Sequence, residues 1–408
     1  MTVGANRVGE FKTHWRALAG CTLAASIGTI GLQAYTGGAF FAALTGDGVF
    51  TRTQLSFATF LLSATVAVVA PFAGMVMDRF GALRVIGLAI MGEAVGFTLL
   101  GVSAGHGLAA FAAATVILGL LGVGTTPPGF ARIVTARFDR GRGLALGVMI
   151  SGLGLMAMSG PIWANWLIAQ VGWRTAYFCL SLIVMVLGGV GALLIRSDLK
   201  RVPAPASSHR HVGGDWQALR EPIFWAIFAG FMAPALFGGG YLLHMISLLH
   251  ERGFSTANAA KVQSLIGLAV LTGRLGSGAA LDRFRAQHVA AVAFVISALG
   301  CLILLTSTPA LIAVAALAIG LTIGAELDIL AYMISRYFGL ASFARLYALA
   351  YAGLIVAGGL SPLMISLIAE HGGYSLALVI SAVGILIGVL VLLLLPQAAR
   401  LATDEDPT

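Results

Sequence analysis

Charged side chains are scarce in this sequence. Asp, Glu, Lys and Arg make up 10% of the 408 residues, whereas a soluble domain averages about 25%. Hydrophobic residues make up 59%, the mean hydropathy is +0.96, and the shortage of charge extends along almost the whole chain. A soluble domain carrying a single membrane anchor is therefore excluded.

The sequence also has few of the residues that hold metals, nucleotides or cofactors. Its three cysteines, Cys21, Cys179 and Cys301, lie far apart in apolar stretches. We interpret them as small buried hydrophobic residues and expect neither a metal site nor a disulfide. No G-x-x-x-x-G-K-[ST] loop is present, which argues against an ATP-driven pump. The lack of H-E-x-x-H and of an external Ser/His/Asp cluster gives no support to a membrane enzyme, and we expect no cofactor.

What the sequence has instead is a series of apolar runs of about 20 residues or more. Each run is long enough to cross roughly 30 Å of hydrocarbon at about 1.5 Å per residue. They predict an all-α polytopic membrane protein surrounded by lipid. We place twelve runs at approximately 16–43, 52–77, 84–103, 108–134, 141–168, 174–196, 222–249, 257–281, 288–306, 309–335, 343–368 and 374–396.

The net charge of +8 is distributed as in a membrane protein and not as in a nucleic-acid-binding protein. With the N-terminus placed in the cytoplasm, two of the 24 Lys and Arg fall within spans and 18 fall in cytoplasmic segments. This asymmetry fixes the orientation, so we expect both termini on the cytoplasmic side of the inner (plasma) membrane. The four in external loops are Arg52, Arg174, Arg252 and Lys261.

A polar stretch between the sixth and seventh runs divides the chain. RSDLKRVPAPASSHRHVGGDWQALREP, residues 196–222, has the Pro, Ser, Gly and basic content of a solvated linker. We therefore predict an N-terminal six-helix bundle over 1–196, a cytoplasmic linker over 197–221, and a C-terminal six-helix bundle with a short cytoplasmic tail over 222–408.

The two halves also resemble each other in sequence. GMVMDRFG (74–81) ends the second run and GAALDRFR (278–285) ends the eighth, while VGWRTAYF (171–178) corresponds to HGGYSLAL (371–378). The offsets are 204 and about 200 residues. Matches in the same order at nearly one offset predict a duplicated six-helix unit, and hence two pseudo-symmetric bundles.

Twelve spans in two halves, with Gly-x-x-x-Asp-Arg-x-Gly between spans two and three, resemble the major facilitator superfamily over essentially the whole chain. Within it, the sequence is similar to the oxalate/formate antiporter and monocarboxylate transporter branch. The resemblance implies two bundles that rock around a central site lined by spans one, four, seven and ten. The similar segments are TGGAFFAALTGDGVFTRTQLSFA (36–58), LLHERGFSTANAA (248–260) and TGRLGSGAALDRF (272–284).

Arg274 is a charge that the membrane cannot easily accommodate. A guanidinium keeps its charge, so it must face protein or a water-filled cavity, where it can bind a carboxylate bidentately. Its position eight residues before Asp282 places it roughly 12 Å inside the membrane. The related carboxylate transporters carry a substrate-binding arginine in this span, although their acid one turn earlier is replaced here by Val270. A structural ion pair is the alternative.

Three carboxylates lie inside predicted spans. Asp328 is eight residues before Arg336, roughly 12 Å inside and level with Arg274. Glu326 lies about 200° around the helix from Asp328, so we expect only one of the two to face the pathway. Glu93 lies in the middle of span three. Such groups can load and release a proton, which makes Asp328, Glu326 and Glu93 candidates for proton coupling, with structural pairing as the alternative.

Polar residues near the predicted cavity are further candidates for substrate binding. They are Gln33 and Tyr35 in span one, and Tyr241 and His244 toward the outer end of span seven. For each of them, packing or an interfacial position is the alternative.

The resemblance also implies a cytoplasmic charge latch that biases a two-state equilibrium. A few kcal/mol, about the size of several surface ion pairs, is enough for such a bias. Its residues would be Asp78, Arg79, Arg84, Asp139, Asp282 and Arg283.

Together these features predict a secondary transporter of small organic anions, chiefly monocarboxylates, that works by alternating access with proton symport or anion exchange. Its partners would be the anion, a proton or counter-anion, and the lipid bilayer, and we expect a monomer. One alternative is a proton-coupled drug or cation exporter in which the acids line the pocket and Arg274 is structural. Another is a non-transporting sensor, which the short tail after residue 396 does not favour.

Overall fold

The computed structural model describes residues 7–138, 141–201, 219–281 and 283–396. Every regular element in these ranges is a helix, and ten continuous segments are long and apolar enough to cross a membrane. The predicted all-α membrane architecture is confirmed, and the protein is an integral membrane protein that crosses the bilayer many times.

Two of these segments are too long for one crossing. They have 55 and 48 residues, whereas one crossing needs about 20. Each contains a glycine at positive φ, Gly172 (75°) and Gly373 (69°), a conformation that glycine adopts without steric cost. Dividing the two segments there would raise the number of spans from ten to the predicted twelve, a count that stays a prediction. The two glycines are 201 residues apart, close to the offset between the sequence halves.

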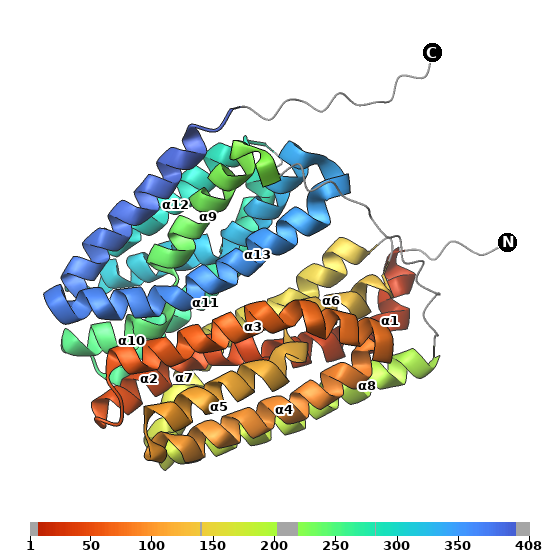
Figure 1. Cartoon of the computed structure of the whole chain (residues 1–408), viewed down its shortest axis with the longest axis horizontal. Helices are drawn as coiled ribbons and strands as arrows, with labels where there is room; N and C mark the ends of the chain where they lie inside the picture. Colours follow the sequence, from red (N-terminus) through yellow and green to blue (C-terminus); the bar gives the residue numbers. More distant parts are fainter. Residues whose placement is uncertain (1–6, 139–140, 202–218, 282, 397–408) are drawn as a thin grey trace. The chain divides into compact units, whose positions relative to one another are not determined.

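The chain folds into two compact units. In the first unit, α1 packs against α7 and α8, α2 packs against α7 and α10, and α4 packs against α5 (Figure 1). Its elements are α1 (Arg7–Ser26), α2 (Thr29–Gly46), α3 (Arg52–Phe80), α4 (Ala82–Ser103), η1 (Ala104–His106), α5 (Leu108–Gly122), η2 (Val123–Thr125), α6 (Pro127–Thr135), α7 (Arg142–Ile183), η3 (Val184–Gly188), α8 (Gly189–Arg201), α10 (Tyr241–Glu251) and the part of α11 (Thr256–Leu281) that ends at Leu268.

The second unit contains α9 (Pro222–Gly238), the remainder of α11 from Ala269, α12 (Ala286–Ile303) and α13 (Pro309–Leu393). Within it, α13 packs against both α9 and α12 (Figure 1). Since Tyr241–Leu268 belongs to the first unit, these units do not coincide with the predicted bundles. The bundle boundaries stay a prediction, and most of the predicted linker lies outside the described residues.

Two helices of the first unit are interrupted at positions that meet. The first span breaks between α1 and α2, where Gly28 is extended and Thr29 starts the next helix. The fourth breaks at η2, after which Pro127 starts α6 because proline suits the first turn of a helix. The backbone N–H of Thr29 donates to Thr125 Oγ1 at 3.0 Å, so the two breaks are joined directly.

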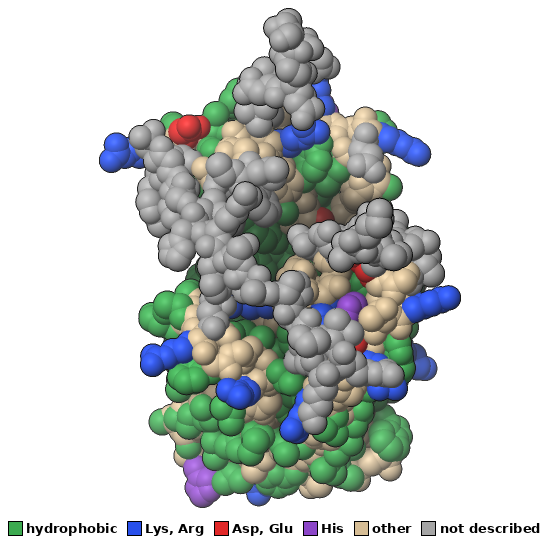
Figure 2. Space-filling view, turned by 90° about the vertical axis from the view of Figure 1, so that its right-hand side faces the viewer, with side chains coloured by type: hydrophobic (Ala, Val, Ile, Leu, Met, Phe, Trp, Pro, Cys, Tyr) green, Lys and Arg blue, Asp and Glu red, His purple; other side chains and the backbone are tan. Residues whose placement is uncertain are grey.

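The helices expose many large apolar side chains, as helices facing lipid do. Leu88 is 70% exposed and Leu275 71%. The face seen in Figure 2 carries more Lys and Arg than Asp and Glu between its apolar side chains. The predicted orientation stays a prediction.

Candidate functional site

In the second unit, α11 and the first part of α13 approach so closely that glycine is required. A Cβ added to Gly324 would lie 2.1 Å from the carbonyl oxygen of Val270, and one on Gly273 would lie 2.5 Å from that of Leu321. Small residues allow this kind of backbone approach between membrane helices. The contact places the residue after Gly273, which is Arg274, beside the helical turn that follows Gly324.

Arg274 and Asp328 form an ion pair at this crossing. The Nε atom of Arg274 lies 3.7 Å from Oδ2 of Asp328, with the two side chains 22% and 37% exposed. The distance is too long for a hydrogen bond, so the pair is electrostatic. Within the described part of the chain, no hydrogen bond occupies the guanidinium donors. Arg274 therefore has both a counter-charge and free donors.

Three further polar side chains lie within the electrostatic reach of Arg274. Glu326 is half-buried and Arg274 acts on its carboxylate. Arg274 also acts on Tyr347 and Tyr351, whose ring centroids are 6.2 Å apart. The two tyrosines were not among the site residues predicted from the sequence. Their i, i+4 spacing in an otherwise apolar span, which puts them on one helix face, is the signal that would have found them.

In the first unit, Glu93 is fully buried on α4. Its Oε2 lies at a hydrogen-bond distance of 2.7 Å from Thr125 Oγ1, and Thr29 is the other hydroxyl beside it. Its Oε1 has no hydrogen-bond partner. The carboxyl group thus lies at the point where the breaks of spans one and four meet, beside the hydroxyl groups of Thr125 and Thr29.

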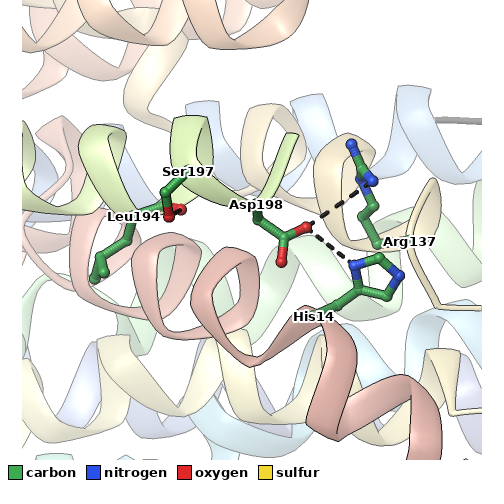
Figure 3. A network of polar contacts seen from close by, with 5 residues as sticks. All are labelled: His14, Arg137, Leu194, Ser197 and Asp198. Atoms are coloured by element: carbon green, nitrogen blue, oxygen red, sulfur yellow. Dashed lines mark hydrogen bonds and ion pairs between the residues drawn. The ribbon is translucent and has the colours of Figure 1, made fainter. Parts of the chain in front are cut away.

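A second fully buried carboxylate, Asp198, holds three segments of the first unit together (Figure 3). Its Oδ2 lies 3.0 Å from His14 Nδ1 on α1 and 3.9 Å from Arg137 Nη1 in the segment after α6. Burial lowers the pKa of Arg137, an effect that the charge of Asp198 opposes. The sequence analysis missed this cluster because it began the linker at residue 197, whereas α8 continues to Arg201.

The other predicted binding residues of the first unit lie in packed surroundings. Tyr241 and His244 are fully buried on α10, and His244 contacts Phe41 (ring centroids 4.6 Å apart) and Ser56 (Nε2 to Oγ, 3.5 Å). Gln33 lines a cavity of about 20 Å³, roughly enough for one water molecule. Tyr35 is 9% exposed. The structure does not bring these four residues to one substrate-sized cavity of this unit.

The predicted latch stays a prediction. Arg79, Arg84 and Arg283 are exposed, and Arg79 lies over the ring of Phe80 at 5.3 Å. The acidic partners fall outside what the structure describes: Asp139 and Asp282 entirely, and Asp78 in its side chain. Among the residues described, no three His, Cys, Asp or Glu side chains form a group that could hold a metal ion.

Comparison with known proteins identifies the family. The family model described as Major Facilitator Superfamily matches residues 17–288 and 262–407. The uncharacterized MFS-type transporter YhjX of Escherichia coli (strain K12) is 26% identical over 358 residues, which cover 84% of this chain and 85% of that protein. Monocarboxylate transporter 13 of Rattus norvegicus is 27% identical over 145 residues, covering 35% of this chain and 32% of that one.

Solved structures show the same fold. The crystal structure of a D-xylose-proton symporter superposes with a TM-score of 0.73 at 13% identity, covering 95% of this chain and 99% of that one. The family match, the relatives and this fold agree with the repeat that the sequence predicted. The chain belongs to the major facilitator superfamily of membrane transporters.

Proposed function

We propose that this protein is a secondary active transporter of small organic anions, chiefly monocarboxylates, that works by alternating access. The Arg274–Asp328 pair at the crossing of α11 and α13 is the observation that carries the proposal. The partial match to a monocarboxylate transporter supports the same substrate class. The protein would lie in the inner (plasma) membrane as a monomer with both termini in the cytoplasm.

The pair is suited to exchanging partners. A guanidinium in a span needs a counter-charge, and Asp328 supplies one without occupying its hydrogen-bond donors. A substrate carboxylate can offer Arg274 a bidentate interaction, which is stronger than a contact at 3.7 Å. The empty and loaded states would therefore both leave Arg274 with a counter-charge, and binding would release Asp328.

The net charge of the site connects this exchange of partners on Arg274 to proton coupling. With Asp328 and Glu326 ionised, the site carries one positive and two negative charges, and a bound monoanion adds a third negative charge. Uptake of a proton by Asp328 or Glu326 would offset that addition and give symport, with Glu93 as a third candidate. Exchange of one anion for another leaves the charge unchanged and needs no proton.

Counterflow and gradient-driven uptake of radiolabelled lactate, pyruvate and formate into proteoliposomes test the proposal. Arg274→Lys should abolish both activities, since one ammonium group cannot reproduce the planar fork. Arg285→Lys makes the same substitution at an exposed arginine and should transport normally. Glu326→Gln and Asp328→Asn, tested with and without a pH gradient, separate symport from exchange.

Normal anion transport by Arg274→Lys would contradict the assignment of Arg274 as the anion site and would favour the hypothesis of a cation exporter. Efflux of a radiolabelled lipophilic cation, abolished by Glu326→Gln or Asp328→Asn but not by Arg274→Lys, would establish that alternative.

A further inference from the structure

The cluster around Glu93 exists because two glycines let spans one and four touch. A Cβ added to Gly28 would lie 2.1 Å from the carbonyl oxygen of Thr125, and one on Gly122 would lie 2.0 Å from Thr29 Oγ1. This approach puts the start of α2 in contact with η2, and Glu93 of α4 contacts η2 through Thr125. The three elements share one set of hydrogen bonds.

The oxygen atoms in this cluster outnumber the protons available to join them. Thr125 Oγ1 lies 2.7 Å from Glu93 Oε2 and 2.8 Å from the carbonyl oxygen of Gly122. Both of these atoms are acceptors when Glu93 is ionised, but the hydroxyl has a single proton. One contact would then place two oxygen atoms at hydrogen-bond distance with no proton between them.

A proton on Glu93 supplies the hydrogen that the contact between Glu93 and Thr125 lacks, and leaves only the longest contact, 3.1 Å between the hydroxyl oxygens of Thr29 and Thr125, without one. The acid donates from Oε2 to Thr125 Oγ1, which donates in turn to the carbonyl of Gly122. Thr125 Oγ1 also accepts from the N–H of Thr29, and the Thr29 hydroxyl, 3.0 Å from the same carbonyl of Gly122, donates to it. The unpartnered Oε1 is then a neutral carbonyl oxygen, which is less costly to bury than a carboxylate oxygen.

No charged group is available to compensate an ionised Glu93. Among the described residues of the elements packed against α4, the only side chains that act on Glu93 are Thr125 and Thr29, and no Lys, Arg, His, Asp or Glu does. A cation of the size of Ca²⁺ in place of the proton is disfavoured by the spacing. Oxygen ligands about 2.4 Å from one cation lie about 3.4 Å apart in octahedral geometry, whereas these oxygen atoms are 2.7–3.1 Å apart.

We propose that Glu93 carries a proton in this conformation, and that this proton keeps spans one and four joined at their breaks through Thr125 and Thr29. Loss of the proton leaves a buried charge and one hydrogen bond too few, so it favours separation of η2 from α2. The role in coupling rests on the proposed transport function, whereas the presence of the proton does not. The coupling proton would thus be held in the first unit, apart from Arg274.

Infrared difference spectroscopy of the purified protein in D2O, titrated around neutral pH, tests the first part. The wild type should show the C=O stretching band of a protonated carboxyl group, and Glu93→Gln should lack it. Thr125→Val should move the band to higher frequency because the hydrogen bond is lost, while Thr125→Ser should leave it in place. Identical spectra of wild type and Glu93→Gln, or no movement in Thr125→Val, would overturn the assignment.

Lactate transport tests the second part. In Glu93→Gln, counterflow should persist while pH-driven uptake falls to the level seen without a gradient. Full pH-driven uptake in this variant would overturn the coupling role even if the infrared band is present. A different result would contradict the proposed function, namely normal transport by Arg274→Lys. That result would not affect the infrared assignment of the proton to Glu93.

Discussion

The acidic residues of the two units differ in the chemical group that lies next to the carboxylate. Asp328 in the second unit faces a guanidinium and is partly exposed, whereas Glu93 in the first unit faces two hydroxyl groups and is fully buried. A carboxylate beside a cation can remain ionised and exchange partners with another anion. A carboxylate among neutral donors at zero exposure favours a bound proton. The two proposals together assign anion recognition to the second unit and proton binding to the first.

Asp198 adds a third arrangement, in which the carboxylate is buried with both a cation and an imidazole. His14, Arg137 and Asp198 come from α1, the segment after α6, and α8. A ligand-binding site needs hydrogen-bond donors that are available to the ligand, as those of Arg274 are. Holding three segments together does not need them, so we interpret this cluster as structural. Its burial matches that of Glu93 but not that of Asp328, and its partners distinguish it from both.

Removing the cation from the second unit should have the largest effect. Arg274→Gln leaves Asp328 and Glu326 with neutral neighbours, like Glu93. Loss of a buried charged partner costs about 2–5 kcal/mol, so lactate counterflow should fall by about a thousandfold, to background. Adding Asp328→Asn removes the stranded charge and should recover thermal stability without recovering transport. Transport by the double variant would show that the pair does not bind substrate.

Disrupting the third arrangement should affect stability more than transport. Asp198→Asn removes the carboxylate charge beside the guanidinium of Arg137, whose side chain is 2% exposed. Breaking a buried pair costs about 3–5 kcal/mol, and we expect the lower end because the atoms are 3.9 Å apart. Thermal unfolding in detergent should show a lower Tm, and His14→Asn, which leaves the ion pair in place, should show a smaller decrease. An unchanged Tm in Asp198→Asn would contradict the structural role.

The sequence predicted some of these arrangements because they depend on local counting. Residue spacing from the span ends placed Arg274 and Asp328 at one depth, and the structure brings them together. The neighbours of Glu93 depend instead on two helix breaks that meet only because Gly28 and Gly122 allow the approach. Asp198 was missed for another reason: a polar helix end and a polar linker have the same composition, and only packing against α1 distinguishes them.

Widening the crossing of α11 and α13 should weaken the second site without changing any charge. Gly324→Ala would place a methyl group 2.1 Å from the carbonyl of Val270, so the helices must separate and Arg274 must move away from Asp328. Displacement by about 1 Å can cost on the order of tenfold or more in activity, and we expect about a tenfold loss of lactate uptake. Gly276→Ala, also on α11, has open space at the added Cβ and serves as the control. Equal activity in both variants would show that the close approach is not needed.

The smallest effect is expected from the tyrosines of α13, which add neutral hydrogen-bond donors to a charged site. Arg274 acts on Tyr351, which also lies beside Tyr347. If the Tyr351 hydroxyl donates to the anion held by Arg274, Tyr351→Phe removes one hydrogen bond, worth about 0.5–1.5 kcal/mol.

The KM for lactate should then rise by about two- to tenfold with little change in kcat, because the hydroxyl contributes to binding in both ground and transition states. Tyr332→Phe, which removes a hydroxyl that accepts from Arg336, should leave KM unchanged. A fall in kcat at constant KM would instead assign Tyr351 to the conformational step. In that case the second unit, like the first, would use a neutral hydroxyl to hold helices together, and recognition of the anion would rest on Arg274 alone.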